Sequence, residues 1–210
     1  MENTAKKIAA YLLQIKAIKL QPSNPFTWAS GWKSPIYCDN RKTLSFPEVR
    51  QAIRDAFTGV VKEKYPDAEL IAGVATGAIA HGVLVAEAMG LPFVYVRSGA
   101  KEHGLGKQIE GFYEKGQKVV VIEDLISTGG SSLRAVSALR DAGCNVLGMI
   151  AIFTYGFQKA YDNFSADEVT LFTLSDYNAL IDKAVSTGYI TINDVETLRE
   201  WRQDPANWCK

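Results

Sequence analysis

Several features that would assign a chain to a large class of proteins are scarce or missing in this sequence. Its three cysteines, Cys38, Cys144 and Cys209, are an odd number and show no CxxC spacing. They therefore favour free thiols in a reducing cytosol over a disulfide framework. Neither sign of charge is in excess, since Lys plus Arg and Asp plus Glu both number 23. No global basic field would draw the chain onto nucleic acid or an anionic membrane, so any anion site must be local.

Long apolar runs and internal repeats are also missing. No stretch has the apolar length that a membrane-spanning helix needs, and no repeat or low-complexity segment is present. Residues 1–20 carry lysines after only a short apolar run and lack a small-residue cleavage site. They predict an amphipathic helix rather than a secretory leader. We expect a cytoplasmic protein that contacts neither membrane nor nucleic acid.

The order of the predicted elements indicates an α/β fold. With 47% apolar residues, the 210-residue chain can bury one substantial core with a small appendage. Residues 1–45 form a predicted N-terminal helix and an appendage of short extended pieces, because prolines and a glycine interrupt 21–41. Residues 46–210 form the core with the C-terminal helices as one structural unit. In this core we expect strands at 69–75, 92–97, 119–124, 145–153 and 168–175, helices at 46–64, 78–90 and 131–143, and two C-terminal helices. Such alternation predicts a Rossmann-like parallel sheet flanked by helices.

Two helix starts have the spacing of a capping box. Ser45 and Glu48 precede the helix at 46–64, and Asn193 with Glu196 precedes the last helix. We expect these side chains to cap the free N–H groups of the two helices.

The stretch VVVIEDLISTGGSS, residues 119–132, follows a buried strand with two acids and a turn of small residues. Ligands of parallel sheets bind at the carboxyl ends of the strands, and a Gly, Ser and Thr-rich turn before a helix can cradle a phosphate. The turn lacks the lysine of GxxxxGK[ST], so it is not a nucleoside triphosphate loop. Glu123 and Asp124 could accept hydrogen bonds from ribose hydroxyls and attract a hydrated Mg²⁺. The alternative is that the acids solvate a strand end and the glycines serve the turn.

This stretch resembles the phosphoribosyl diphosphate (PRPP) signature of the type I phosphoribosyltransferases. The resemblance implies that the ribose hydroxyls bind the acid pair and that the 5′-phosphate binds the turn. The implied PRPP-binding residues here are Glu123, Asp124, Leu125, Ile126, Ser127, Thr128, Gly129, Gly130 and Ser131. Ser127 also falls at the position that contacts orotate in the family.

A second segment, VYVRSGAKEHGLGKQIEG at 94–111, is too long and polar for a tight turn and predicts a mobile cover. Without the signature at 119–132, it could equally be a solvated basic loop. It resembles the catalytic loop of orotate phosphoribosyltransferases, in which cations hold the diphosphate. The resemblance implies PRPP contacts from Arg97, Lys101 and His103, with Lys101 as the leading catalytic residue and His103 assisting. Cations there would stabilise the charge that develops on the departing diphosphate.

Three further segments extend the resemblance over nearly the whole chain. FTWASGWKSPIYCDNR at 26–41 resembles the N-terminal hood of the orotate enzymes. GVATGAIAHG at 73–82 resembles the loop that continues their diphosphate site, and 175–190 resembles their C-terminal helical region. The fold implied is the type I phosphoribosyltransferase fold with a small N-terminal hood.

The sequence departs from this pattern where other members carry lysine. The residues here are Ala29, Gly77, Ser98 and Gly99. An arginine that contacts orotate in other members is not apparent near IFTYGF at 152–157. The resemblance therefore leaves open how the orotate carboxylate is held.

The implied reaction transfers the 5-phosphoribosyl group of PRPP to orotate, giving orotidine 5′-monophosphate and diphosphate. Mg²⁺ is the implied cofactor, carried with the diphosphate, and we predict no metal ligand in the chain. The resemblance also implies a homodimer that shares loop 97–107 across its interface. His81, on an apolar helix, is expected to pack rather than react. The alternatives are a PRPP-sensing regulator without turnover and a phosphoribosyltransferase for another base.

Overall fold

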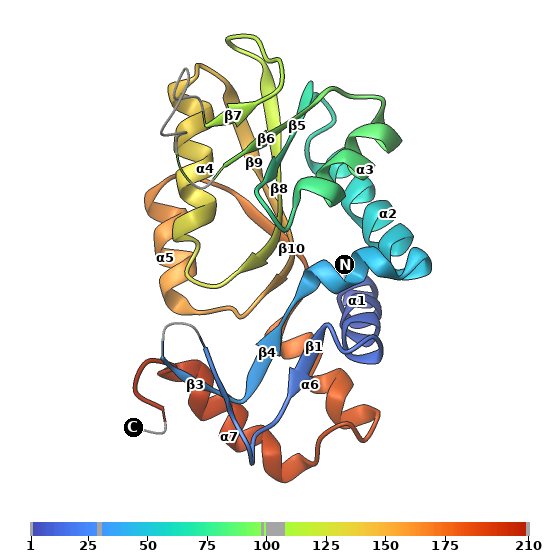
Figure 1. Cartoon of the computed structure of the whole chain (residues 1–210), viewed down its shortest axis with the longest axis vertical. Helices are drawn as coiled ribbons and strands as arrows, with labels where there is room; N and C mark the ends of the chain where they lie inside the picture. Colours follow the sequence, from blue (N-terminus) through green and yellow to red (C-terminus); the bar gives the residue numbers. More distant parts are fainter. Residues whose placement is uncertain (1, 29–30, 98, 100–107, 209–210) are drawn as a thin grey trace.

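The structure is a computed structural model that describes residues 2–28, 31–97, 99 and 108–208. Its centre is a six-stranded sheet in the order β10-β9-β8-β5-β6-β7 (Figure 1). Neighbouring strands are parallel except for β7, which is antiparallel to β6. The strands are β5 Leu70–Val74, β6 Phe93–Val96, β7 Ile109–Glu110, β8 Lys118–Ile126, β9 Asn145–Thr154 and β10 Leu171–Asp176. The predicted α/β class and parallel sheet are confirmed.

Helices cover both faces of this sheet, because each strand buries side chains in both directions. Along β8, Val120 and Ile122 enter one apolar cluster, and Val119 and Val121 enter the other. Figure 1 shows α4 and α5 on one side of the sheet and α2 and α3 on the other. The helices are α1 Glu2–Gln14, α2 Pro47–Lys64, α3 Ile79–Met89, α4 Gly130–Asp141, α5 Gln158–Ala166, α6 Tyr177–Ser186 and α7 Ile192–Gln203. None of the helices in the part of the chain that is described has the length and apolar character to cross a bilayer.

The hood consists of short antiparallel strand pairs beside the C-terminal helices (Figure 1). Strand β1 pairs with β4, and β2 pairs with β3; β2, β3 and β4 are the short extended pieces predicted within 21–41. The elements are β1 Ile18–Leu20, β2 Phe26–Thr27, β3 Lys33–Ser34, β4 Ile36–Cys38 and the 3₁₀ helix η1 Asn40–Ser45. Residues 18–20 thus leave the amphipathic helix predicted over 1–20, since α1 ends at Gln14.

Trp201 of α7 joins the hood to the core. Its fully buried ring lies 5.7 Å from the rings of both Trp28 in the hood and Tyr155 after β9, measured between centroids. Tyr177 of α6 lies 5.8 Å from the same ring. Aromatic contacts at these distances add to the free energy gained by burying the rings, so α7 holds the hood against the sheet.

Both predicted capping boxes are wrong. Ser45 belongs to η1, and α2 begins after Phe46 without a side-chain cap. Glu48 instead accepts a hydrogen bond from the hydroxyl of Tyr11, at 3.0 Å. The last helix is capped by Thr191 with Asp194.

The strand predicted at 119–124 continues past the two acids to Ile126, because β9 pairs with it to that point. Helix α5 is missing from the prediction. Its two buried apolar side chains, Ala160 and Phe164, are a weak helical signal in nine residues.

Replacing Trp201 by alanine should lower the free energy of unfolding by about 3–5 kcal/mol, because it empties the space of a fully buried ring. Urea unfolding followed by circular dichroism measures this change. Ile192→Ala is the control on the same helix, since Ile192 is 70% exposed and its loss should cost little. Equal unfolding midpoints for the two variants would contradict the role given to Trp201.

Candidate active site

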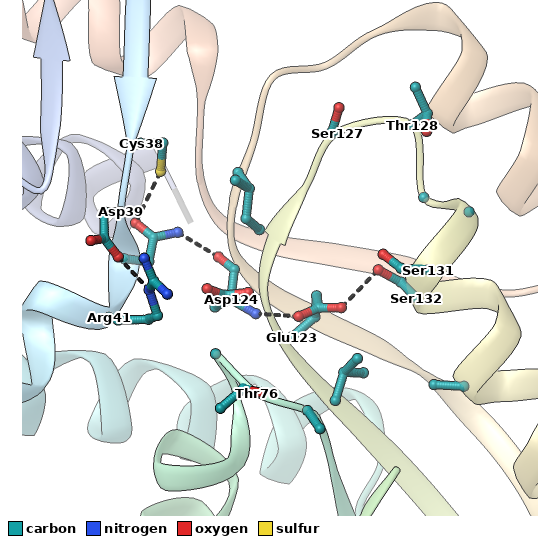
Figure 2. A pocket seen from close by; sticks show the side chains of 18 of the residues that line it. Cys38, Asp39, Arg41, Thr76, Glu123, Asp124, Ser127, Thr128, Ser131 and Ser132 are labelled. Carbon is teal, nitrogen blue, oxygen red and sulfur yellow. Dashed lines mark hydrogen bonds and ion pairs between the residues drawn. The ribbon is translucent and has the colours of Figure 1, made fainter. Parts of the chain in front are cut away.

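A cavity of about 550 Å³ opens where β5 and β8 end. Its walls come from the hood, from the turn after β5, from the end of β6, and from β8 with the start of α4 (Figure 2). The lining residues are Cys38, Asp39, Asn40, Arg41, Val74, Ala75, Thr76, Gly77, Arg97, Glu123, Asp124, Leu125, Ser127, Thr128, Gly129, Gly130, Ser131, Ser132 and Ala135. The carboxyl ends of parallel strands are the usual position for a ligand in such a sheet.

The two neighbouring acids both line the cavity, Glu123 toward α4 and Asp124 toward the hood, and their carboxyl groups lie close enough to interact (Figure 2). Glu123 is 4% exposed and faces α4. Its Oε1 accepts a hydrogen bond from the backbone N–H of Asp124 at 2.8 Å, and Oε2 accepts one from Ser132 Oγ at 2.7 Å. Asp124 is only partly buried and lies on the hood side of the cavity. The pair therefore offers one buried carboxyl group and one accessible carboxylate.

Burial raises the pKa of Glu123 to about 8, and the charge of Asp124 beside it acts in the same direction. Desolvation penalises the charged form of an acid, and a nearby negative charge adds to that penalty. The bond from Ser132 opposes the shift without cancelling it. Near neutral pH, Glu123 is thus able to hold a proton while it keeps its bonds to β8 and α4.

The turn between β8 and α4 is built for close approach of a ligand to its backbone. Gly129 has φ +82°, a conformation that favours glycine, and a Cβ there would lie 2.6 Å from the ring of Phe164. Both the backbone conformation and the lack of space therefore favour glycine at this position. Asn163 of α5 donates a hydrogen bond to the carbonyl of Thr128 at 2.8 Å. Because α4 starts at Gly130, its free N–H groups and its positive dipole end face the cavity. This geometry suits a phosphate group.

A smaller aromatic pocket of about 340 Å³ adjoins the large cavity. The two share Cys38, Leu125 and Ser127. The pocket is lined by Thr27, Trp28, Tyr37, Cys38, Leu125, Ser127 and Tyr155. Three aromatic rings beside a hydroxyl can hold a flat heterocycle by stacking and orient it by hydrogen bonds.

The predicted PRPP-binding residues fall into three groups. Of those at 123–131, Ile126 is fully buried in the apolar core, and the others line the cavity. Arg97 also lines it, and its Nη1 lies 3.5 Å from Glu110 Oε1. Lys101 and His103 lie outside the described residues.

Sequence reasoning missed the hood residues that enter the cavity, Asp39, Asn40 and Arg41. Asn40 Nδ2 donates to the carbonyl of Asp124 at 2.6 Å, across 84 positions of the chain. Arg41 Nε donates to Asp39 Oδ1 at 2.7 Å, which lowers the pKa of Asp39. The letters CDNR sit in the quoted hood motif, but nothing in their spacing indicates that they meet β8.

His81 packs as expected. It is 1% exposed, and its Nε2 lies 2.9 Å from Thr43 Oγ1. Burial, with a smaller contribution from the charge of Arg50, lowers its pKa to about 4, so the ring is neutral at neutral pH.

The pKa of Glu123 predicts how stability depends on pH. Between about pH 5 and pH 8 the unfolded chain releases this proton while the folded protein keeps it, so the free energy of unfolding should fall as pH rises. Each pKa unit of difference is worth about 1.4 kcal/mol. Urea unfolding across this range should show the fall in the parent protein and a flatter profile in Glu123→Gln. Glu196→Gln, an exposed change, should keep the parent slope, and equal slopes for all three would refute the assignment.

Comparison with known proteins agrees with this geometry. The family model described as "Phosphoribosyl transferase domain" matches residues 43–183. The orotate phosphoribosyltransferase of Porphyromonas gingivalis is 59% identical over 208 residues, covering 99% of both chains, and that of Bacillus caldolyticus is 58% identical over 201 residues, covering 96% of this chain and 97% of its own.

Solved structures share the fold. The orotate phosphoribosyltransferase of Aeropyrum pernix matches with a TM-score of 0.75 and 26% identity over 88% of this chain and 99% of that chain. The UMP synthase of Leishmania donovani matches with a TM-score of 0.79 and 23% identity over 94% of this chain, which corresponds to 42% of the longer protein. Because sequence identity is high over nearly full length, this chain belongs to the orotate phosphoribosyltransferase family.

Proposed function

We propose how the residues of this chain carry out the reaction of its family. The protein is a transferase that moves the 5-phosphoribosyl group of PRPP to orotate, giving orotidine 5′-monophosphate and diphosphate. The observation that carries the assignment of roles is the junction of two pockets at Ser127, one suited to a sugar phosphate and one to a flat base. A nucleotide bond can form where two such pockets meet.

In this proposal PRPP occupies the larger cavity. The turn from Ser127 to Ser131 binds the 5′-phosphate through backbone N–H groups and hydroxyls. Asp124 accepts hydrogen bonds from the ribose hydroxyls, since its carboxylate faces the cavity. Glu123 holds Asp124 and Ser132 in place from behind. Each oxygen of the Glu123 carboxyl group already accepts one of these bonds.

Orotate occupies the aromatic pocket. Tyr37 is 42% exposed, and Tyr155 lies on the inner wall with its ring 5.5 Å from that of Trp28. Trp28 is fixed because its Nε1 donates to the carbonyl of Ile36 at 3.1 Å. The base would stack against these rings while Ser127 contacts its polar edge.

The departing diphosphate is bound by cations in this proposal. Arg97 lines the cavity, and Lys101 and His103 are assigned to the same group by family resemblance. Mg²⁺ prefers oxygen ligands and usually binds through phosphates, waters and one or two carboxylates. Asp124 and Asp39 are carboxylates that border the cavity and fit this demand. When bound, the ion supplies positive charge to the diphosphate.

The transfer needs no covalent nucleophile. The ribose carbon passes through an oxocarbenium-like state, so the protein must position the base and stabilise the leaving group. We further propose that the protein works in the cytoplasm as a homodimer, with loop 97–107 completing the site of the partner.

The experiment that tests the proposal follows the loss of the near-ultraviolet absorbance of orotate on mixing the protein with PRPP and Mg²⁺. Uracil and hypoxanthine serve as alternative acceptors. Consumption of orotate alone is the expected result. Turnover of another base, or PRPP binding without turnover of any base, would favour one of the two alternatives, which the high identity to orotate enzymes does not support.

Asp124→Asn should reduce kcat/KM for PRPP by about ten- to a hundredfold, since hydrogen bonds to charged groups are worth about 1.5–3 kcal/mol. Steady-state kinetics with varied PRPP measures the effect. Asp141→Asn, an exposed change in the last turn of α4, should leave the kinetics unchanged. Parent-like kinetics in Asp124→Asn would remove Asp124 from the site.

Lys101→Ala should lower kcat by about a hundredfold or more while changing the KM for orotate little, because the charge acts on the leaving group. Lys115→Ala, an exposed change near the amino end of β8, is the matched control. A change confined to the KM for orotate would assign Lys101 to base binding instead.

A further inference from the structure

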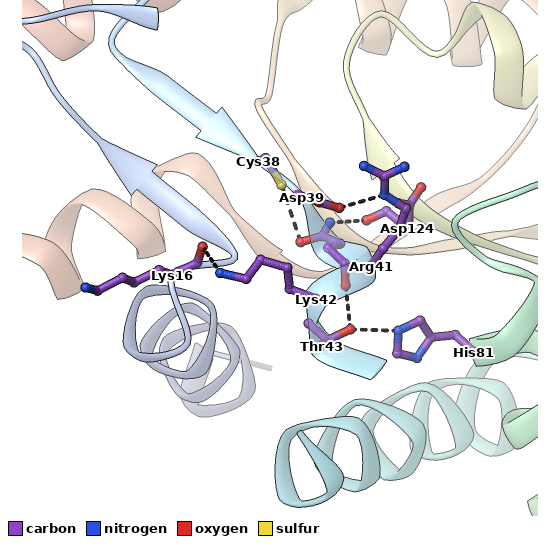
Figure 3. A network of polar contacts seen from close by, with 9 residues as sticks. Lys16, Cys38, Asp39, Arg41, Lys42, Thr43, His81 and Asp124 are labelled. Carbon is purple, nitrogen blue, oxygen red and sulfur yellow. Dashed lines mark hydrogen bonds and ion pairs between the residues drawn. The ribbon is translucent and has the colours of Figure 1, made fainter. Parts of the chain in front are cut away.

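The short helix η1, which carries Arg41 to the cavity, is held by polar contacts to β8, to the residues after α1 and to α3 (Figure 3). Asn40 donates to the carbonyl of Asp124 at 2.6 Å and is 2% exposed. Lys42 Nζ donates to the carbonyls of Ile15 and Lys16, at 3.1 and 3.0 Å. These bonds tie η1 to β8 and to the end of α1.

Thr43 completes the anchorage. Its hydroxyl donates to the carbonyl of Asn40 at 2.5 Å and lies 2.9 Å from Nε2 of His81 on α3. With the residues on both sides of Arg41 fixed in this way, its backbone has little freedom. A group held on such a platform loses less entropy on binding a ligand than one on a free loop.

Arg41 turns its side chain toward the cavity. Figure 2 shows the guanidinium between Asp39 and Asp124. Its side chain is 64% exposed, and Nε donates to Asp39 Oδ1 at 2.7 Å, which raises the pKa of Arg41. Among the residues that the structure describes, no hydrogen bond occupies its terminal Nη groups. These groups are thus available, in a fixed orientation, for an anion in the cavity.

The opposite wall carries no cation at Gly77, the position where other family members have a lysine. A Cβ at Gly77 would overlap the carboxylate of Asp124, so a side chain there would require that carboxylate to turn aside. Gly77 and Thr76 still line the cavity. Within the described part of the cavity wall, Arg41 and Arg97 are the basic side chains. A polyanionic ligand beside Gly77 can therefore have its charge balanced by Arg97 and, from the hood, by Arg41.

We propose that Arg41 binds the diphosphate group of PRPP, an inference that rests on the proposed function. Arg41 lines the large cavity and does not border the aromatic pocket, so the diphosphate rather than the base is within its reach. Asp39 orients the guanidinium through Nε and leaves the Nη fork for phosphate oxygens. Arginine matches phosphate in a two-pronged geometry that lysine cannot reproduce.

The test is calorimetric titration of the protein with inorganic diphosphate, with and without Mg²⁺, and separately with ribose 5-phosphate. Arg41→Gln should weaken diphosphate binding about tenfold or more and leave ribose 5-phosphate binding unchanged. The diphosphate affinity of Arg41→Lys should lie between that of the parent protein and that of Arg41→Gln. Arg54→Gln is the control, since it removes one positive charge from α2, where Arg54 pairs with Asp55 outside the cavity. It should bind diphosphate as the parent does.

Kinetics separates this inference from the proposed function. If the parent protein consumes orotate and Arg41→Gln raises the KM for PRPP but not that for orotate, the inference holds. Unchanged diphosphate affinity in Arg41→Gln would overturn it, as would a rise confined to the KM for orotate, which would assign Arg41 to the orotate carboxylate. If the parent protein turns over no base, the proposed function fails, but the diphosphate titration still decides whether Arg41 is an anion-binding residue.

Discussion

The burial of the Glu123 carboxyl group is the constraint on which the active site depends. A carboxyl group inside an apolar core must find hydrogen-bond partners, and Glu123 finds them in Ser132 of α4 and in the backbone of Asp124. These bonds set where α4 begins relative to the end of β8. Since strand side chains alternate, Asp124 leaves β8 toward the hood, where it is only partly buried. The phosphate turn and the accessible carboxylate thus follow from the satisfaction of one buried acid.

The second half of the site comes from the hood, which has no independent core. Its strands are two or three residues long and could not hold a shape alone. Packing of Trp28 on Trp201 and the bond from Asn40 to the Asp124 carbonyl fasten it to the sheet. The aromatic pocket and the large cavity meet where the hood contacts the end of β8. The contacts that stabilise the hood therefore also fix the position of the base relative to the sugar.

Local patterns predicted β5, β6, β8, β9 and β10 because each is a mainly apolar run, and α3 and α4 because they are closed by glycine or amphipathic. Strand β7, within the predicted cover segment, was missed because its two residues are too few to give a strand pattern. Gly90, in the left-handed conformation, ends α3 as expected. The errors fall where tertiary contacts override local preference. Ser45 belongs to η1, a helix that the contacts of Asn40 and Thr43 hold in place. Helix α5 buries only two apolar side chains, which are too few to give a helical pattern in the sequence. The motif at 119–132 located the turn and the acids.

The resemblance of residues 119–132 to a family signature indicated transfer of a phosphoribosyl group. By itself, the sequence also determined the α/β class and the order of the strands along the chain. These follow from periodicities of two and 3.6 residues and from residue types at fixed spacing, which are local properties. Only the tertiary structure decided that Asn40 of the hood meets the carbonyl of Asp124, that a Cβ at Gly77 would meet the carboxylate of Asp124, and that Arg41 shares a cavity with Asp124. The physical reason is that such contacts join segments far apart in the chain, and packing rather than local pattern selects which of them meet.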